Sequence, residues 1–172
     1  MNIQITTAAP ALADERPLEL LYACHERIRR FIALAGRLAE HVETKGADEQ
    51  ARDAATQILR YFELSLPNHH ADEEEDVFPA LRGLNDAVLA HAIAALEAEH
   101  AMLDALWNDV APSLRRVAEG IVDPAPASLA RFIAAYPVHI EREEREVFSA
   151  IERLPVAVAD VIAQRMRARR GA

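Results

Sequence analysis

The stretch "AYPVHIEREEREVFSAI" (residues 135–151) has an apolar stripe at helical spacing that also carries a histidine and a glutamate. His139 and Glu143 are four residues apart, so at about 100° per residue they lie one turn apart on one face of a helix. Tyr136 and Val147 share that face, and an apolar face of this kind predicts a helix packed against a core. The sequence therefore predicts that a histidine and a carboxylate are buried together.

The same pattern occurs 70 residues earlier, in "SLPNHHADEEEDVFPAL" (residues 65–81). His69 and Glu73 hold the two polar positions there, again on a stripe of apolar residues. In both copies a proline stands two residues before the histidine, at Pro67 and Pro137. A proline inside a helix removes one backbone hydrogen bond, so we expect a bend beside each histidine.

The internal repeat extends to the preceding helices, where "LYACHERI" (residues 21–28) and "LEAEHAML" (residues 96–103) align one lone histidine with another. The chain is thus predicted to contain two helix-loop-helix units, each with a histidine on its first helix and a His-x-x-x-Glu on its second. The polar residues predicted to point into the core are His25, His69, Glu73, His100, His139 and Glu143.

The composition favours helix over sheet, because 51% of the 172 residues are apolar but only 5% are aromatic, and there are 5 glycines. Start and stop signals predict four long helices at about residues 17–43, 48–81, 86–119 and 128–151, and a short basic helix that opens at Pro155. We therefore predict an all-α, up-down-up-down four-helix bundle with a short C-terminal helix. Residues 1–14 are predicted to be an N-terminal extension, and residues 15–172 the bundle.

The two core glutamates restrict how such a bundle can be stable. An unpaired carboxylate buried among apolar side chains must be protonated, paired with a cation or bound to a metal. No lysine or arginine lies on the glutamate-bearing stripes, and Arg29 on the first helix cannot neutralise two carboxylates. A single His-x-x-x-Glu is usually a solvated pair on a helix surface. Two copies on apolar stripes, each with its own lone histidine, favour a metal centre instead.

Neighbouring residues offer alternatives within the same motifs. His70 and Glu74 form a second His-x-x-x-Glu frame, although the repeat alignment favours the frame one residue earlier. Glu144 lies about 100° round the helix from Glu143, so we expect it to contribute little to metal binding.

The donor set narrows the choice of metal. Imidazole and carboxylate ligands without a thiolate suit iron, manganese or zinc. Six ligands from four helices exceed a closed tetrahedral zinc site and suit two ions bridged by the two carboxylates. Ferritin-like bundles use Glu-x-x-His, whereas the order and spacing here are His-x-x-x-Glu, which argues for another family.

The motifs resemble those of the hemerythrin-like, HHE cation-binding family. "HHADEEEDVFP" is similar to the motif of that family's second helix, "HIEREEREVF" to that of its fourth, and "CHERIRRF" and "EAEHAML" to its lone-histidine helices. The resemblance covers about residues 15–153 and implies a non-heme di-iron centre in a four-helix bundle. It implies bridging roles for Glu73 and Glu143 and terminal-ligand roles for His25, His69, His100 and His139.

The third helix departs from one branch of this family. Oxygen-carrying hemerythrins have two histidines four apart on that helix, whereas here Leu96 precedes His100 at that spacing. The four-histidine, two-glutamate set is more similar to the di-iron proteins implicated in nitric oxide response and iron-sulfur cluster repair. Further candidates to complete the coordination sphere are His70, Glu97 and Asp104, and the sequence does not choose among them.

From these features we expect a cytoplasmic di-iron protein that binds or senses O2, NO or peroxide at a carboxylate-bridged centre. The expected cofactor is a pair of iron ions, with manganese or zinc less favoured. The alternative is a redox enzyme in NO or peroxide detoxification or iron-sulfur cluster repair, and a redox-inert zinc site is a third hypothesis. The expected partner is a small diatomic ligand or peroxide, and the sequence identifies no protein partner.

Charge and hydropathy argue against a nucleic-acid-binding protein and against a membrane protein. The formal net charge of −9 gives no general electrostatic attraction to nucleic acid. We expect no membrane insertion, because the chain contains no 18-residue apolar run and does not begin like a secretory signal. The single Cys24 cannot form an internal disulfide, which agrees with a reducing cytoplasm. The arginines of "RMRARRGA" (residues 165–172) are expected to complement a helix C-terminus rather than bind phosphate.

Overall fold

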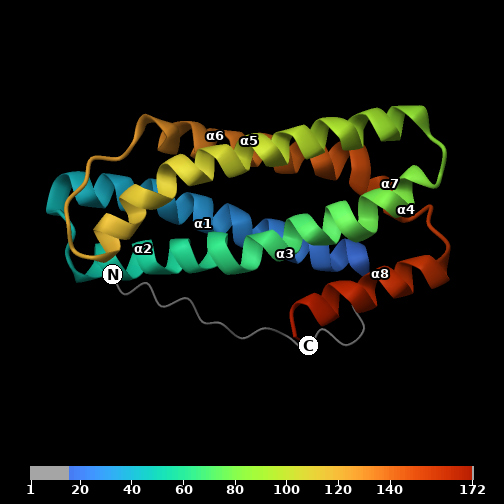
Figure 1. Ribbon diagram of the computed structural model, residues 1–172, viewed down its shortest axis with the longest axis horizontal. Helices are drawn as coiled ribbons and strands as arrows, with labels where there is room; N and C mark the ends of the chain where they lie inside the picture. Colours follow the sequence, from blue (N-terminus) through green and yellow to red (C-terminus); the bar gives the residue numbers. More distant parts are fainter. Residues whose placement is uncertain (1–15, 172) are drawn as a thin grey trace.

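The computed structural model describes residues 16–171, and all regular secondary structure in that range is helical. The prediction of an all-α protein is confirmed. The predicted N-terminal extension, residues 1–14, lies outside the described residues. Figure 1 shows long helices lying side by side, with the C-terminal helix, in red, at one corner of the assembly. No helix within residues 16–171 is long and apolar enough to cross a lipid bilayer.

The first long helix, α1 (Pro17–Lys45), has clear signals at both ends. Proline is tolerated in its first turn because no helical hydrogen bond is lost there. The Arg16 N–H donates a hydrogen bond to the Glu19 carboxylate at 3.0 Å. The helix ends at Gly46, whose φ of 79° is a left-handed conformation that suits glycine.

The second long helix is continuous but changes its hydrogen-bonding pattern along its length. Asp48 caps it by accepting a hydrogen bond from the Ala51 N–H at 3.0 Å. Its segments are α2 (Glu49–Arg60), the π-helical η1 (Tyr61–Ser65), α3 (Leu66–Ala71), the π-helical η2 (Asp72–Val77) and α4 (Phe78–Arg82).

The second half of the chain again has one long helix followed by a second long helix that contains a π-helical segment. Asp86 caps the third long helix by accepting hydrogen bonds from the N–H groups of Val88 and Leu89. The segments are α5 (Ala87–Ala118), α6 (Ala127–Glu143), the π-helical η3 (Glu144–Phe148) and α7 (Ser149–Ile151), followed by the C-terminal helix α8 (Val156–Arg169).

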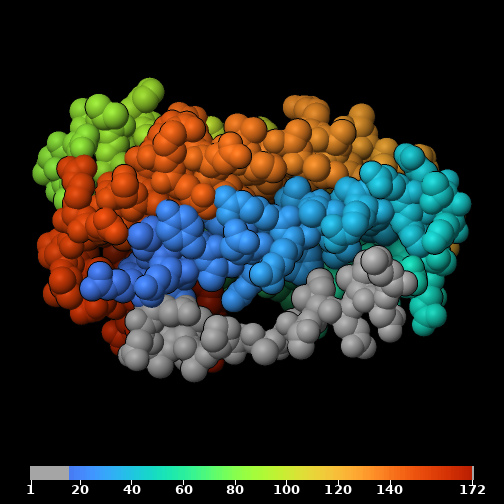
Figure 2. All heavy atoms as spheres, turned by 180° about the vertical axis from the view of Figure 1, so that it is seen from behind, coloured from blue at the N-terminus to red at the C-terminus, as the bar shows by residue number. Residues whose placement is uncertain are grey.

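The long helices form a closed ring of neighbours. α1 packs against α2 and α6, and α5 packs against the same two helices. Figure 2, which shows the molecule from behind, places α1 (blue) alongside α6 (orange). The structure thus confirms a helical bundle, and the alternating up-down order of its helices stays a prediction.

Two apolar clusters form the core, and the predicted polar residues lie between them. On α1, Ile28 belongs to the first cluster and Leu21 to the second, on either side of His25. The same order recurs on α5, where Leu103 and Leu96 flank the aligned histidine. The bundle therefore has a polar layer across its middle, enclosed by apolar packing at both ends.

The helical irregularities differ in part from the expected proline bends. η1 ends at Ser65, two residues before Pro67, whereas α6 runs through Pro137 as a regular α-helix. Both copies of the repeat instead have a π-helical turn at the glutamate, because η2 contains Glu73 and η3 begins directly after Glu143. Such turns occur frequently at functional sites.

Candidate metal centre

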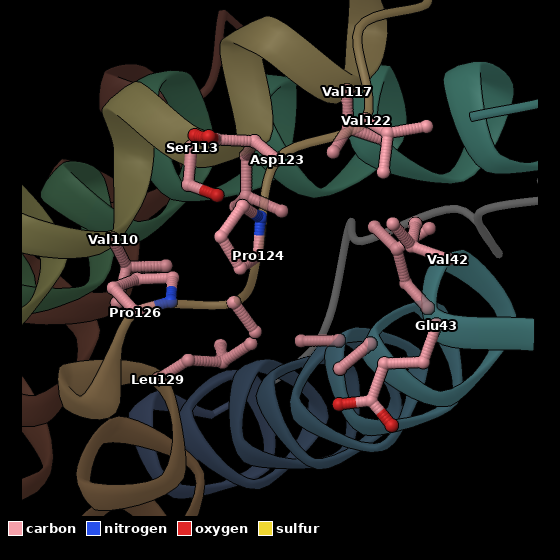
Figure 3. A pocket seen from close by; sticks show the side chains of 15 residues that line it. Val42, Glu43, Val110, Ser113, Val117, Val122, Asp123, Pro124, Pro126 and Leu129 are labelled. Atoms are coloured by element: carbon pink, nitrogen blue, oxygen red, sulfur yellow. The ribbon is translucent and has the colours of Figure 1, made fainter. Parts of the chain in front are cut away.

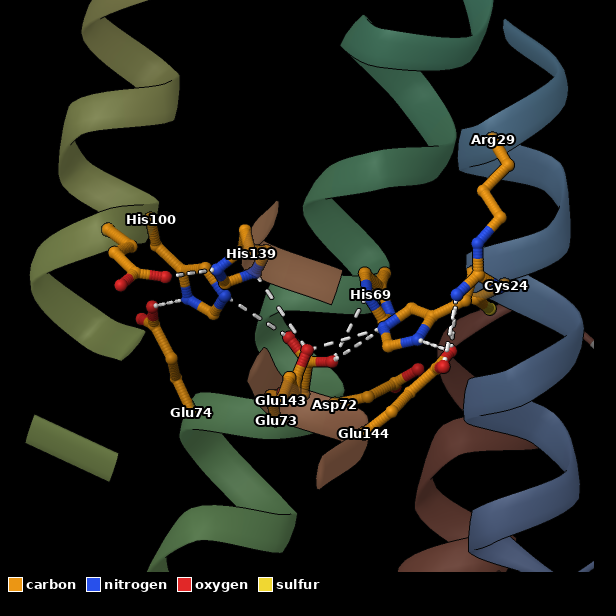
Figure 4. Close-up of polar contacts among 12 residues, drawn as sticks. Cys24, Arg29, His69, Asp72, Glu73, Glu74, His100, His139, Glu143 and Glu144 are labelled. Atoms are coloured by element: carbon orange, nitrogen blue, oxygen red, sulfur yellow. Dashed lines mark hydrogen bonds and ion pairs between the residues drawn. The ribbon is translucent and has the colours of Figure 1, made fainter. Parts of the chain in front are cut away.

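The six predicted residues meet in the polar layer of the bundle, and Figure 4 labels all of them except His25. None of them exposes more than 3% of its surface, in agreement with the helix faces assigned from the sequence. The layer is made of His25 from α1, His69 and Glu73 from the second long helix, His100 from α5, and His139 and Glu143 from α6.

Two histidines of the first repeat lie on one side of the paired glutamates. His69 Nε2 is 3.1 Å from a Glu73 oxygen, and His25 Nε2 is 3.3 Å from a Glu143 oxygen. The two rings are 5.0 Å apart between centroids. One potential ligand atom from each of these four residues lies within 4.8 Å of the others, so together they could hold a metal ion.

The histidines of the second repeat lie across the glutamates from the first pair. His100 Nε2 is 3.4 Å from the other Glu73 oxygen, and His139 Nε2 is 3.8 Å from Glu143. Their ring centroids are 4.8 Å apart. Glu73 thus has a histidine of each repeat at a different carboxylate oxygen, whereas His25 and His139 lie nearest to the same oxygen of Glu143.

Burial makes the charged forms of these groups unfavourable. It raises the pKa of the Glu73 carboxyl well above its ordinary value, and the nearby charge of Glu143 raises it further. Burial also lowers the pKa of His69 and of His100, and neighbouring imidazoles add to the effect. The imidazoles of His69 and His100 are therefore held neutral, which is the form that binds metal.

Many polar atoms in this layer have no hydrogen-bond partner within the described protein. Buried polar groups are nearly always hydrogen-bonded, because an unsatisfied one costs about 1–3 kcal/mol. A metal cation would satisfy nitrogen and oxygen lone pairs together, so the residues fit a metal centre. The unpartnered atoms of the layer are His25 Nε2, His69 Nδ1, His100 Nε2, His139 Nε2 and both carboxylate oxygens of Glu73 and Glu143.

Three further carboxylates hold the outer ring nitrogens of the histidines. Each accepts a hydrogen bond from an Nδ1–H, which places the lone pair on Nε2 and turns it toward the layer. These outer pairs are His25 with Glu144 at 2.8 Å, His100 with Glu74 at 2.7 Å and His139 with Glu99 at 2.9 Å.

The outer carboxylates bear on two residues discussed from the sequence, Arg29 and Glu144. Arg29 donates to both oxygens of Glu144, at 2.9 and 3.0 Å, and is therefore engaged outside the core rather than with the core glutamates. Glu144, which we expected to contribute little, contacts His25 on the neighbouring helix. The repeat holds one signal that could have identified it, because Glu74 and Glu144 occupy the same repeat position.

The three further candidates for the coordination sphere lie in different surroundings. His70 stacks on His100 with 4.1 Å between ring centroids, and burial lowers its pKa to about 4. Its Nε2 has no hydrogen-bond partner within residues 16–171. Glu97 forms an ion pair with Arg82 at 2.7 Å. Asp104 exposes 63% of its side chain. His70 is thus the candidate that contacts the polar layer.

A cavity of about 320 Å³ lies between α1, α5 and the segment that leads into α6 (Figure 3). Its walls are mostly apolar, with Val42, Val110 and Leu129 among them, and Glu43 and Asp123 are also part of the lining. It shares no residue with the polar layer, so it is separate from the candidate metal centre.

The fold and the polar layer together define a class of protein: an all-helical bundle whose core carries histidines and glutamates arranged to hold cations. Comparison with known families agrees, because the model described as "Hemerythrin HHE cation binding domain" matches residues 16–151. The chain belongs to the hemerythrin HHE cation-binding family. It is also 33% identical, over 155 residues and 90% of each chain, to an "Uncharacterized protein" of Haemophilus influenzae (strain ATCC 51907 / DSM 11121 / KW20 / Rd).

Proposed function

We propose that this protein is a cytoplasmic, non-heme di-iron protein that binds or senses O2, NO or peroxide. The observation that carries the proposal is the convergence of unpartnered imidazole nitrogens and carboxylate oxygens within a closed apolar core. Membership of a cation-binding family supports the same conclusion. In this proposal the long helices run alternately up and down, as in other four-helix bundles that hold a pair of ions between facing helices.

The proposed ligands divide between two ion positions. His25 and His69 would hold one ion, His100 and His139 would hold the other, and Glu73 and Glu143 would be shared between them. Iron is favoured because mixed nitrogen and oxygen donors without thiolate suit it, and manganese or zinc would fit the same donors less specifically.

The residues around the layer support this assignment. Bound iron supplies Lewis acidity and a reversible change of oxidation state. The outer carboxylates keep three imidazoles in one tautomer, and the apolar clusters exclude bulk water from the layer. Six protein donors shared between two ions leave room for a further small ligand, and the burial of the layer favours a diatomic molecule or peroxide.

Metal analysis with a visible absorption spectrum tests the proposal. We expect about two iron atoms per chain after anaerobic iron loading, and a spectrum that changes when O2, NO or peroxide is added to the ferrous protein. His100→Ala should lose iron, whereas His91→Ala, an exposed position on the same helix, should retain it. A single ion per chain, no iron, or equal losses from the two variants would overturn the dinuclear centre.

Product analysis separates a binding protein from the alternative redox enzyme. A binding or sensing protein consumes at most a stoichiometric amount of NO or peroxide per centre. Product that accumulates over many cycles with an added electron donor would instead establish turnover.

A further inference from the structure

The C-terminal helix α8 packs beside the candidate metal centre although it lies beyond the segment that the family comparison matches, residues 16–151. Its apolar face belongs to the second core cluster through Ile162, Ala163 and Met166. It contacts both α1 and η2, the segment that contains Glu73. This helix is therefore an integral part of the bundle at the level of the polar layer.

The end of α8 places a guanidinium group between two ligand-bearing helices. One terminal nitrogen of Arg170 donates to the Asp72 carboxylate and, at 3.3 Å, to the Cys24 sulfur. The other terminal nitrogen donates to the Met166 carbonyl at 2.6 Å, which fixes the direction of the side chain. Arg170 thereby connects η2 and α1 through a single group.

Arg169 strengthens the contact with η2. It donates to Asp72 at 2.5 Å, to Glu75 at 2.9 Å and to Asp76 at 2.9 Å. Asp72 has no exposed surface and accepts from both arginines, so its charge is matched by two cations within the protein. The acidic run of the second long helix and the basic run of α8 thus neutralise one another beside the polar layer.

The two groups that Arg170 connects are direct chain neighbours of proposed ligands. Cys24 precedes His25 on α1, and Asp72 precedes Glu73 at the start of η2. We propose that Arg170 is a positioning residue for the metal centre, which holds the backbone of α1 and η2 so that His25 and Glu73 converge on the same ion. This inference rests on the proposed function, and it adds a determinant that lies outside the matched family segment.

The chemistry of the contact indicates that Arg170 positions the residues it contacts and is more than a surface charge. A guanidinium presents several donors in one rigid plane, so it can join separate acceptors, whereas an ammonium is a single point charge. Arg170 contacts a buried carboxylate and a buried thiol. Arg115, by contrast, forms a mostly exposed ion pair with Glu63 at 2.6 Å and supplies a matched control.

The test measures iron release from the full-length protein to an excess of a ferrous chelator under anaerobic conditions. We expect release from Arg170→Ala to be roughly tenfold faster than from the wild type, as is typical when a group that supports metal ligands is removed. Arg170→Lys should lie between the two, because it restores the charge but not the planar set of donors. Arg115→Ala should release iron at the wild-type rate. The visible spectrum should shift in Arg170→Ala and not in Arg115→Ala.

A second variant covers the case in which Arg170→Ala does not fold. Asp72→Asn keeps the size of the side chain and removes the buried charge, and it should also accelerate iron release. If folded variants release iron at the wild-type rate, or if Arg115→Ala has the same effect, the positioning role is wrong.

Hydrogen exchange of the metal-free protein distinguishes a failure of this inference from a failure of the proposed function. We expect faster amide exchange in residues 72–77 of Arg170→Ala than in the wild type, with little change in α5. If the wild type binds no iron but this local effect is present, the proposed function fails while the structural connection stands. Unchanged exchange in residues 72–77 would overturn the connection itself, whether or not iron binds.

Discussion

At the scale of single residues, the histidines of the polar layer are oriented by hydrogen bonds from outside it. Three of them have a carboxylate at Nδ1, and the fourth, His69, has a buried Nδ1 without a partner among the described residues. An Nδ1–H that donates to a carboxylate fixes the ring plane and leaves Nε2 free to bind. Three of the four rings are therefore arranged for a metal before any ion binds.

Glu144→Ala tests this orientation directly. The variant removes the acceptor of the His25 Nδ1–H and the partner of Arg29. We expect iron affinity to fall by roughly tenfold, because groups that support metal ligands typically have effects of this size. Glu141→Ala, an exposed position on the same helical stretch, is the control and should bind iron like the wild type. Equal affinities for all three proteins in chelator competition would show that the outer carboxylate is dispensable.

Glu73→Gln tests the electrostatics of the metal-free layer. Burial raises the folded-state pKa of Glu73, so the favourable protonated form is populated at low pH and is lost as pH rises through that pKa. Glutamine mimics the protonated form at every pH. With chelator present, the variant should therefore unfold at a higher temperature than the wild type at pH 7, and the difference should shrink as pH falls toward about 4.3, the ordinary pKa of glutamate. A difference that grows on acidification would contradict the raised pKa.

The inner part of the site was predictable from the sequence, whereas in the outer part only Glu74 and Glu144 share a repeat position that could have marked them. His139 and Glu143 share one helical face with apolar residues, so periodicity alone indicates that they are buried. Glu99 gives no such signal, because its bond to His139 depends on how α5 and α6 are placed against each other. The partners of Arg170 likewise depend on where a fifth helix docks, which no local pattern specifies.

At the scale of helices, the N-terminal caps explain why element boundaries were predicted closely. Asp48 and Asp86 both accept backbone hydrogen bonds at the residue where the sequence rules predict a helix start. The π-helical segments were not predicted, because no single residue type encodes them. Two of these segments, η2 and η3, lie at the core glutamates Glu73 and Glu143, which relates them to the site rather than to local propensity.

Asp86→Ala tests the contribution of a cap. Loss of the cap of α5 should lower the free energy of unfolding by about 1 kcal/mol, measured by urea denaturation of the iron-loaded protein. Asp86 also pairs with Arg153 at 2.9 Å, on an exposed surface. Arg153→Ala removes that pair alone and should cost less, since exposed ion pairs contribute about 0–1 kcal/mol. Equal costs for the two variants would assign the effect to the ion pair.

At the scale of the whole molecule, the polar layer divides the apolar core into two clusters. Without a cation, the centre of the bundle has unpartnered nitrogens and two carboxylates that repel each other. In the metal-free protein, burial of the unpartnered polar layer costs free energy, whereas burial of the apolar clusters on either side of it stabilises the fold. Metal binding therefore contributes to the stability of the fold as well as to function.

Iron removal should accordingly destabilise the protein. A ligand bound only by the folded state stabilises it by mass action, and two tightly held ions should contribute several kcal/mol. We expect the iron-loaded protein to unfold at a higher temperature and a higher urea concentration than the chelated protein at pH 7. Superimposable curves, with metal contents confirmed to differ, would show that the six residues do not form a buried metal shell.

The internal repeat gives the polar layer an approximate twofold symmetry, in which the 3.3 Å contact of His25 with Glu143 corresponds to the 3.4 Å contact of His100 with Glu73. In the proposed dinuclear centre, each repeat would contribute both histidines of one ion position, and the two glutamates would be shared. His69 and His139 occupy the same repeat position, but among the described residues only His139 has a carboxylate at Nδ1, so a difference between the effects of changing the two histidines would measure what that carboxylate contributes.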